Sequence, residues 1–95
     1  MAFVPQDNCL YRLITGLDDD MVLDVSQNPQ SMNSIILYKW NNGPNQKFAF
    51  RSVGNNRYAI FCSKNNMTVE VPEGKNNDGA QIVCSQPNKK ENEFW

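Results

Sequence analysis

The stretch Ile35–Phe48 (IILYKWNNGPNQKF) decides how the rest of this chain is interpreted. It begins with β-branched and aromatic residues, which favour the half-buried surface of a strand. The residues Asn41-Asn42-Gly43-Pro44 follow, and these types supply the backbone angles of a tight turn. A Gln-Lys-Phe step then leads into another apolar run. The stretch therefore predicts a strand, a turn and a second strand.

The same layout returns at Ile82–Trp95 (IVCSQPNKKENEFW), so the chain contains an internal repeat. Pairs of similar residues lie 47 positions apart: Tyr11 and Tyr58, Ile35 and Ile82, Gln46 and Glu93, and Phe48 and Trp95. Leu23-Asp24-Val25 matches Val69-Glu70-Val71 at an offset of 46, so one residue is dropped and then restored. We predict one domain, 1–95, with repeats at about 9–54 and 55–95. Repeats of this length indicate one supersecondary unit placed around an axis.

Short strands separated by turn clusters predict an all-β fold, a sandwich or a barrel. The expected strands are Leu10–Leu17, Met21–Val25, Ile35–Trp40, Gln46–Val53, Arg57–Cys62, Met67–Val71, Gln81–Ser85 and one that begins at Glu93. Asparagine doublets at 41–42, 55–56, 65–66 and 76–77 stand where apolar runs stop, and they predict turns because Asn tolerates positive φ. No window has the apolar spacing of a capped helix. The predicted core comprises Leu10, Leu13, Val22, Val25, Ile35, Leu37, Trp40, Phe48, Phe50 and Trp95.

Composition excludes several classes of function. The formal charge of -1 argues against nucleic-acid binding through phosphate contacts, and the lack of histidine removes the commonest general base and metal ligand. Asp18-Asp19-Asp20 lacks the ligand spacing of a calcium loop, so we predict no metal site and no cofactor. No apolar run reaches the roughly 18–20 residues of a membrane span.

The three cysteines, Cys9, Cys62 and Cys84, are odd in number and widely spaced, which does not suggest a disulfide framework. Residues 1–8 have no basic and apolar signal region, so we expect a cytoplasmic protein with reduced thiols. A Cys62–Cys84 bridge and secretion by a non-classical route both stay open. Asn66-Met67-Thr68 fits the glycosylation acceptor pattern, which matters only in an exported chain.

The order Tyr11, Leu23-Asp24-Val25, Ile36-Leu37-Tyr38, Asn45-Gln46-Lys47-Phe48 resembles one repeat of the ricin B-type lectin family. Members of that family are β-trefoils whose three repeats each carry a Gln-x-Trp signature. Phe48 replaces the tryptophan in the first unit, and Glu93 replaces the glutamine in the second. The resemblance covers about 9–95 and implies a β-trefoil built from four-strand repeats of about 47 residues.

The resemblance implies a shallow sugar pocket in the first repeat. Asp24 matches the acid that accepts sugar hydroxyls, Tyr38 the aromatic that stacks on the ring, and Asn45 the neighbouring amide. Gln46 is the signature residue, which is more often structural, and Ile36 stands where members often have a polar side chain. A weaker second site is implied at Glu70 and Asn92, where the acid is longer and Ser85 replaces the stacking ring. We expect that second site to be degenerate.

A trefoil needs three units to close its barrel, and only two are present here. Three explanations stay open: the sequence is part of a longer chain, a homo-oligomer supplies the third unit, or the repeat belongs to another closed form such as a propeller. The Trp-Asp and Gly-His marks of the commonest propellers are absent.

The leading functional hypothesis is a non-enzymatic lectin module that binds glycans or glycoconjugates of the galactose or N-acetylgalactosamine type. The alternative is a structural or protein-interaction trefoil without sugar binding. No Ser, Thr or Cys shows a base partner at the level of motifs, and no catalytic residue is predicted. A neighbouring carboxylate and aromatic face are what sugar recognition requires, but Tyr38 packing between strands and Asp24 binding turn amides are equally compatible with the sequence.

Overall fold

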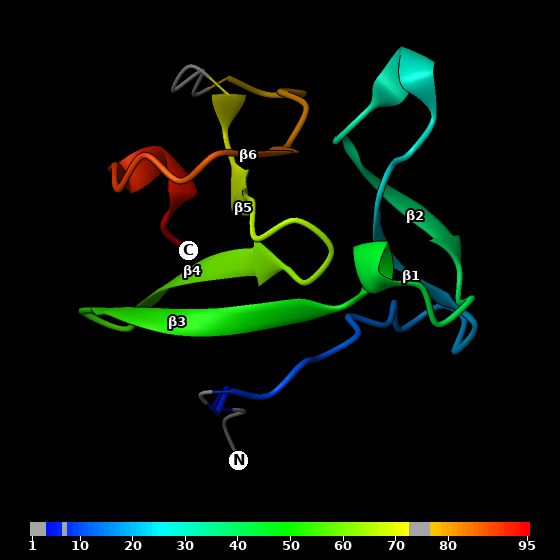
Figure 1. Cartoon of the computed structure of the whole chain (residues 1–95), viewed down its shortest axis with the longest axis horizontal. Helices are drawn as coiled ribbons and strands as arrows, with labels where there is room; N and C mark the ends of the chain where they lie inside the picture. The colour runs from blue at the N-terminus through cyan, green and yellow to red at the C-terminus, as the bar shows by residue number, and fades with distance from the viewer. Residues whose placement is uncertain (1–3, 7, 73–76) are drawn as a thin grey trace.

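The computed structural model describes residues 4–6, 8–72 and 77–95. Its strands form two antiparallel sheets, which are separate in Figure 1. The first sheet pairs β1 (Met21–Val25) with β2 (Ile35–Lys39). The second has the order β3 (Phe48–Gly54), β4 (Arg57–Cys62), β5 (Thr68–Glu70), β6 (Val83–Ser85). Three short 3₁₀ turns complete the described part, η1 (Pro29–Ser31), η2 (Pro44–Gln46) and η4 (Glu91–Glu93), and it contains no α-helix.

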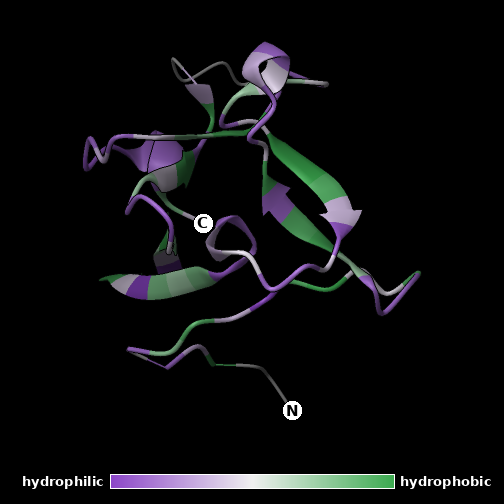
Figure 2. Ribbon diagram, turned by 45° about the vertical axis from the view of Figure 1, so that its right-hand side comes forward, coloured by the Kyte–Doolittle hydropathy of each residue, from purple (hydrophilic) through white to green (hydrophobic). Residues whose placement is uncertain are grey.

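The predicted strands are present with small changes, apart from the first and the last. Leu10–Leu17 forms only isolated bridges, from Tyr11 to Phe48 and from Ile14 to Val22. At the end of the chain, the 3₁₀ turn η4 occupies the expected strand start, and only Phe94 forms a bridge, to Ala59. The all-β prediction is confirmed. Figure 2 shows that apolar segments lie mainly on the strands, whereas the connecting loops are mostly hydrophilic.

The two repeats superimpose in their strand register. Val22 faces Tyr38 in the β1–β2 hairpin, as Thr68 faces Ser85 in the β5–β6 pair. The same register joins Leu23 with Leu37 and Asp24 with Ile36, and in the second unit Val69 with Cys84 and Glu70 with Val83. Reciprocal backbone bonds link Tyr11 with Phe48 and, 47 residues on, Tyr58 with Trp95. The slip of one residue seen in the sequence therefore falls in a loop and leaves the pairing intact.

The asparagine turns follow the prediction where they are described. Asn42, Asn55, Asn56 and Asn66 all have φ between 55° and 64°. The asparagine side chain tolerates this left-handed region better than most residues do. The doublet at 76–77 is not fully described, because residue 76 lies outside the described ranges.

The core lies where the two units meet. Val25, Phe48, Cys62 and Cys84 form one buried cluster, with Leu13, Ile35, Ile60, Met67 and Val69 packed against it. Both thiols of the cluster are free, so no Cys62–Cys84 disulfide is present. Burial, with smaller contributions from Cys62 and Glu70, raises the pKa of Cys84 to about 12. Such a thiol stays protonated and packs as a small apolar side chain.

Three residues predicted for the core are exposed, namely Leu10 at 57%, Leu37 at 48% and Trp95 at 40%. Their positions in the repeat explain two of these errors. Cys84, the counterpart of Leu37, is 3% exposed, and Phe48, the counterpart of Trp95, is 1% exposed. Phe48 and Cys84 are covered because the two units pack together there, whereas the described residues place no unit over Leu37 or Trp95.

Candidate functional site

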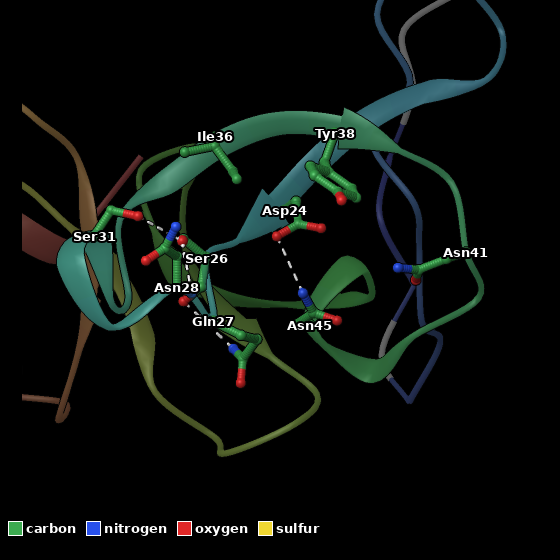
Figure 3. A pocket seen from close by; sticks show the side chains of 9 residues that line it. All are labelled: Asp24, Ser26, Gln27, Asn28, Ser31, Ile36, Tyr38, Asn41 and Asn45. Carbon is green, nitrogen blue, oxygen red and sulfur yellow. Dashed lines mark hydrogen bonds between the residues drawn. The ribbon is translucent and has the colours of Figure 1, made fainter.

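An open pocket of about 400 Å³ lies beside the β1–β2 hairpin (Figure 3). Nine residues line it, from the two strands, the loop after β1 and the turn before β3: Asp24, Ser26, Gln27, Asn28, Ser31, Ile36, Tyr38, Asn41 and Asn45. Three of the four residues predicted for the first sugar site, Asp24, Tyr38 and Asn45, therefore lie around one pocket.

Asp24 holds its carboxylate in a fixed position at the base of this pocket. The residue is 4% exposed, and each of its oxygens accepts one side-chain bond. Oδ1 accepts from Asn45 Nδ2 at 3.1 Å, and Oδ2 accepts from Gln46 Nε2 at 2.8 Å. An ionised carboxylate has about four acceptor positions, so two bonds leave capacity for a ligand.

Gln46 lies beneath the pocket and does not line it. Its side chain is fully buried. Besides binding Asp24, its amide donates to the carbonyl of Lys39 at 2.8 Å, and its Oε1 accepts from the Asn41 backbone N–H at 2.8 Å. Gln46 therefore fixes the end of β2 and the following turn against Asp24, and it offers no surface to a ligand.

Tyr38 is the exposed wall of the pocket. Its side chain is 53% exposed and projects on the same face of β2 as Ile36, two residues earlier (Figure 3). Ile36 adds an apolar side chain to this wall, at the position where members of the ricin B-type lectin family often have a polar one. The alternative that Tyr38 packs between strands is contradicted by its exposure.

A polar loop that was not predicted from the sequence closes the other side of the pocket. Ser26 is 2% exposed and its Oγ lies 2.8 Å from that of Ser31, while the backbone N–H of Asn28 donates to Ser26 Oγ at 3.2 Å. The Asn28 side chain accepts from the Gln30 N–H at 3.0 Å and caps the turn η1. The succession of Ser, Asn and Pro after a short strand was the available signal, because these residues favour capped turns.

The second repeat reproduces part of this geometry. Glu70 is 7% exposed and accepts from Asn92 Nδ2 at 3.1 Å, and the same nitrogen donates to the Val71 carbonyl at 3.1 Å. Asn45 makes the matching bond to the Val25 carbonyl, also at 3.1 Å. Ser85 occupies the position of Tyr38 and supplies no ring.

Glu93 replaces Gln46 with a different set of partners. Like Gln46, it is buried and accepts the backbone N–H five residues earlier, that of Asn88, at 2.9 Å. It also accepts from the Lys89 N–H at 2.8 Å and from the Thr68 hydroxyl at 3.0 Å. A carboxylate cannot donate to Glu70 as Gln46 donates to Asp24, so these two donors replace the interaction that glutamine makes.

No cluster of His, Cys, Asp or Glu suited to a metal ion occurs among the described residues. The triplet at 18–20 forms a turn in which Asp18 Oδ1 accepts from the Asp20 N–H at 2.9 Å. Within residues 4–6, 8–72 and 77–95, no helix has the length and apolar character needed to cross a bilayer.

The fold is shared with several solved structures. A crystal structure of a designed threefold-symmetric protein, ThreeFoil, is similar with a TM-score of 0.81 and 22% identity. The match covers 90% of this chain and 61% of ThreeFoil, so the chain spans about three fifths of that protein. A mosquitocidal holotoxin matches with a TM-score of 0.81 and 16% identity, over 90% of this chain and 11% of the toxin.

Sequence comparison with family models gives a match over residues 3–85 to the ricin-type β-trefoil lectin domain-like family. A search of curated proteins gives no match. The all-β architecture, the repeated register and the family match over most of the length agree with one another. The chain therefore belongs to the ricin-type β-trefoil lectin domain-like family.

Proposed function

We propose that this protein is a carbohydrate-binding lectin module whose working site is the pocket of the first repeat. The observation that carries the proposal is the convergence of a buried carboxylate, Asp24, an amide, Asn45, and an exposed ring, Tyr38, on one open pocket. The ring offers apolar area to the C–H face of a sugar, and the carboxylate accepts hydroxyl protons in charge-assisted bonds.

The hydrogen bonds of Asn45 restrict what the ligand must offer. Both bonds of Asn45 Nδ2 are made within the protein, to Asp24 and to the Val25 carbonyl. An amide nitrogen has two donors, so the group left for a ligand is the carbonyl oxygen. Asp24 and Asn45 therefore both act as acceptors, and a sugar with two adjacent hydroxyl donors satisfies them. We propose a galactose- or N-acetylgalactosamine-type sugar, for which the family membership is the support.

The second repeat is proposed to be a degenerate site. Glu70 and Asn92 keep the acid–amide contact, but Ser85 leaves no stacking surface. A single shallow site gives low affinity, and linking several sites supplies avidity. We further propose that a third unit, from additional sequence or from another copy of the chain, completes the trefoil over Leu37 and Trp95. We also propose a reducing compartment such as the cytoplasm, in which the core thiols would stay reduced.

A titration with N-acetylgalactosamine and galactose, followed by NMR together with a thermal melt, tests the proposal. We expect weak saturable binding that Tyr38→Ala abolishes without lowering the melting temperature, because the side chain is half exposed. Leu37→Ala is the matched control, since Leu37 is 48% exposed on the opposite face of the same strand and does not line the pocket.

A folded wild-type protein that is silent towards a broad glycan array would contradict the sugar proposal. It would favour the second candidate, a trefoil that binds another protein. The exposed apolar residues of the first hairpin, Leu23 and Leu37, are the observation in favour of that candidate.

A further inference from the structure

A second hollow, of about 430 Å³, lies beside the β3–β4 hairpin and shares no residue with the Asp24 pocket. Its lining consists of Asn8, Ala49, Phe50, Arg51, Phe61 and Asn66. Ala49 faces Phe61 across the two strands, and Arg51 follows on the same face of β3. Figure 1 shows the N-terminal segment, which carries Asn8, running alongside β3.

Arg51 presents a positive charge in this hollow, where its guanidinium lies over an aromatic ring. Its guanidinium carbon lies 4.7 Å from the centroid of the Phe61 ring. Within the described residues, it forms no ion pair or hydrogen bond. Arg57, on the neighbouring strand, also lies over a ring, that of Phe94, but it is paired with Glu91 at 3.8 Å. The ring contact therefore orients Arg51 while leaving the N–H groups of its planar fork available.

Two carboxamides border the same hollow, those of Asn8 and Asn66. Neither side chain forms a hydrogen bond with the described residues. This contrasts with Asn41 and Asn65, whose side chains accept backbone N–H groups in their own turns. The hollow thus combines a guanidinium that has no carboxylate partner among the described residues with two carboxamides, each of which can donate to and accept from a hydroxyl.

We propose that this hollow binds a carboxylate flanked by hydroxyl groups, the chemistry of an acidic sugar or of another polyhydroxy acid. The Arg51 fork matches a carboxylate in a two-point, charge-assisted contact, and the amides of Asn8 and Asn66 match the hydroxyls. The site differs in charge from the pocket of the first repeat, where Asp24 disfavours an anion. The protein would then carry two sites, one for a neutral sugar and one for an acidic group.

The test is an amide-shift NMR titration of the full chain with sodium D-glucuronate, with D-glucose and sodium acetate as comparison probes. We expect glucuronate to shift signals of β3 and of the turn at Asn66. Arg51→Gln should weaken glucuronate binding about tenfold, because a charge-assisted contact is lost. Arg57→Gln is the matched control and should leave binding unchanged, since it removes an arginine that lies over a ring outside the hollow.

Further variants distinguish this hollow from the Asp24 pocket of the first repeat. Tyr38→Ala should leave glucuronate binding intact, so loss of the neutral-sugar site and loss of this one are distinguishable. Asn66→Gly removes the carboxamide, and glycine adopts the φ of 57° at this position without strain, so this variant should weaken glucuronate and not acetate. The proposal is overturned if glucuronate gives no saturable shift, if Arg57→Gln weakens binding as much as Arg51→Gln, or if glucose binds at β3 as tightly as glucuronate. Acetate binding as tightly as glucuronate would overturn the role of the hydroxyls.

Discussion

The two repeats share one backbone design but satisfy its buried polar groups in different ways. In the first, Gln46 donates to Asp24 and accepts from the following turn. In the second, Glu93 also accepts a hydrogen bond from its turn. In addition, it accepts hydrogen bonds from the Thr68 hydroxyl and from the backbone N–H of Lys89. Thr68 stands where the first repeat has Val22, and Glu70 where it has Asp24.

The hydrogen bonds that support the pocket therefore depend on a set of residues and not on the signature residue alone. Glutamine brings both a donor and acceptors, so an apolar neighbour such as Val22 suffices. Glutamate brings acceptors alone, and a buried acceptor without a donor costs about 1–3 kcal/mol. The threonine therefore accompanies the glutamate. The repeat tolerates the change of signature residue because its partners have changed with it.

The largest effect is expected when the glutamate of the second repeat is placed at the matching position of the first. Gln46→Glu sets a carboxylate against Asp24 Oδ2 and the Lys39 carbonyl, the two acceptors that Gln46 Nε2 now joins at 2.8 Å each. We expect the free energy of unfolding at neutral pH to fall by about 3 kcal/mol or more, because an uncompensated buried charge is created. Denaturant unfolding measures this loss.

A second substitution tests the explanation. Val22→Thr in the Gln46→Glu background supplies the hydroxyl that Thr68 supplies to Glu93, and should recover about 1 kcal/mol. Equal stability of Gln46→Glu and wild type would show that the donor set is not what distinguishes the units.

Removing the donor from the second repeat gives an intermediate effect. Thr68→Val leaves Glu93 Oε2 with the Asn88 N–H as its one remaining described partner. We expect a loss of about 1–2 kcal/mol in the free energy of unfolding, as for a buried hydrogen bond to a charged group. Thr15→Val is the control, because its hydroxyl accepts an exposed N–H, that of Leu17. A neutral Thr68→Val would contradict the proposed exchange of donors.

The smallest change in the free energy of unfolding is expected at Leu37, which is exposed although its counterpart in the second unit, Cys84, is buried. Leu37→Ser changes a side chain that is 48% exposed and should alter the free energy of unfolding by less than about 0.5 kcal/mol. Cys84→Ser, at the matching position in the second unit, introduces a hydroxyl at a site 3% exposed and should cost more. If the two substitutions cost the same, another surface covers Leu37, and light scattering would show whether that surface belongs to a second copy.

The internal repeat and the all-β class were predictable from the sequence, because local chemistry carries both. Asn42 and Asn56 stop the apolar runs at left-handed positions that asparagine tolerates, and β1 and β4 have the predicted bounds. The grouping of Asp24, Tyr38 and Asn45 was implied by the family resemblance. The alternation of side chains along a strand and the chemistry of turns each involve only a few neighbouring residues, so both can be recognised from the sequence alone.

Burial and hydrogen-bond partners were not predictable in the same way. Leu37 and Cys84 have matching places in their hairpins, yet one is exposed and the other lies in the core, because the units pack on Cys84 and not on Leu37. Gln46 belongs to the sugar motif by sequence but lies beneath the pocket. Arg51, which forms no ion pair with the described residues, stands in a sequence context that gave no signal of this property. These properties depend on which distant segments meet, and that is settled by packing across the whole fold.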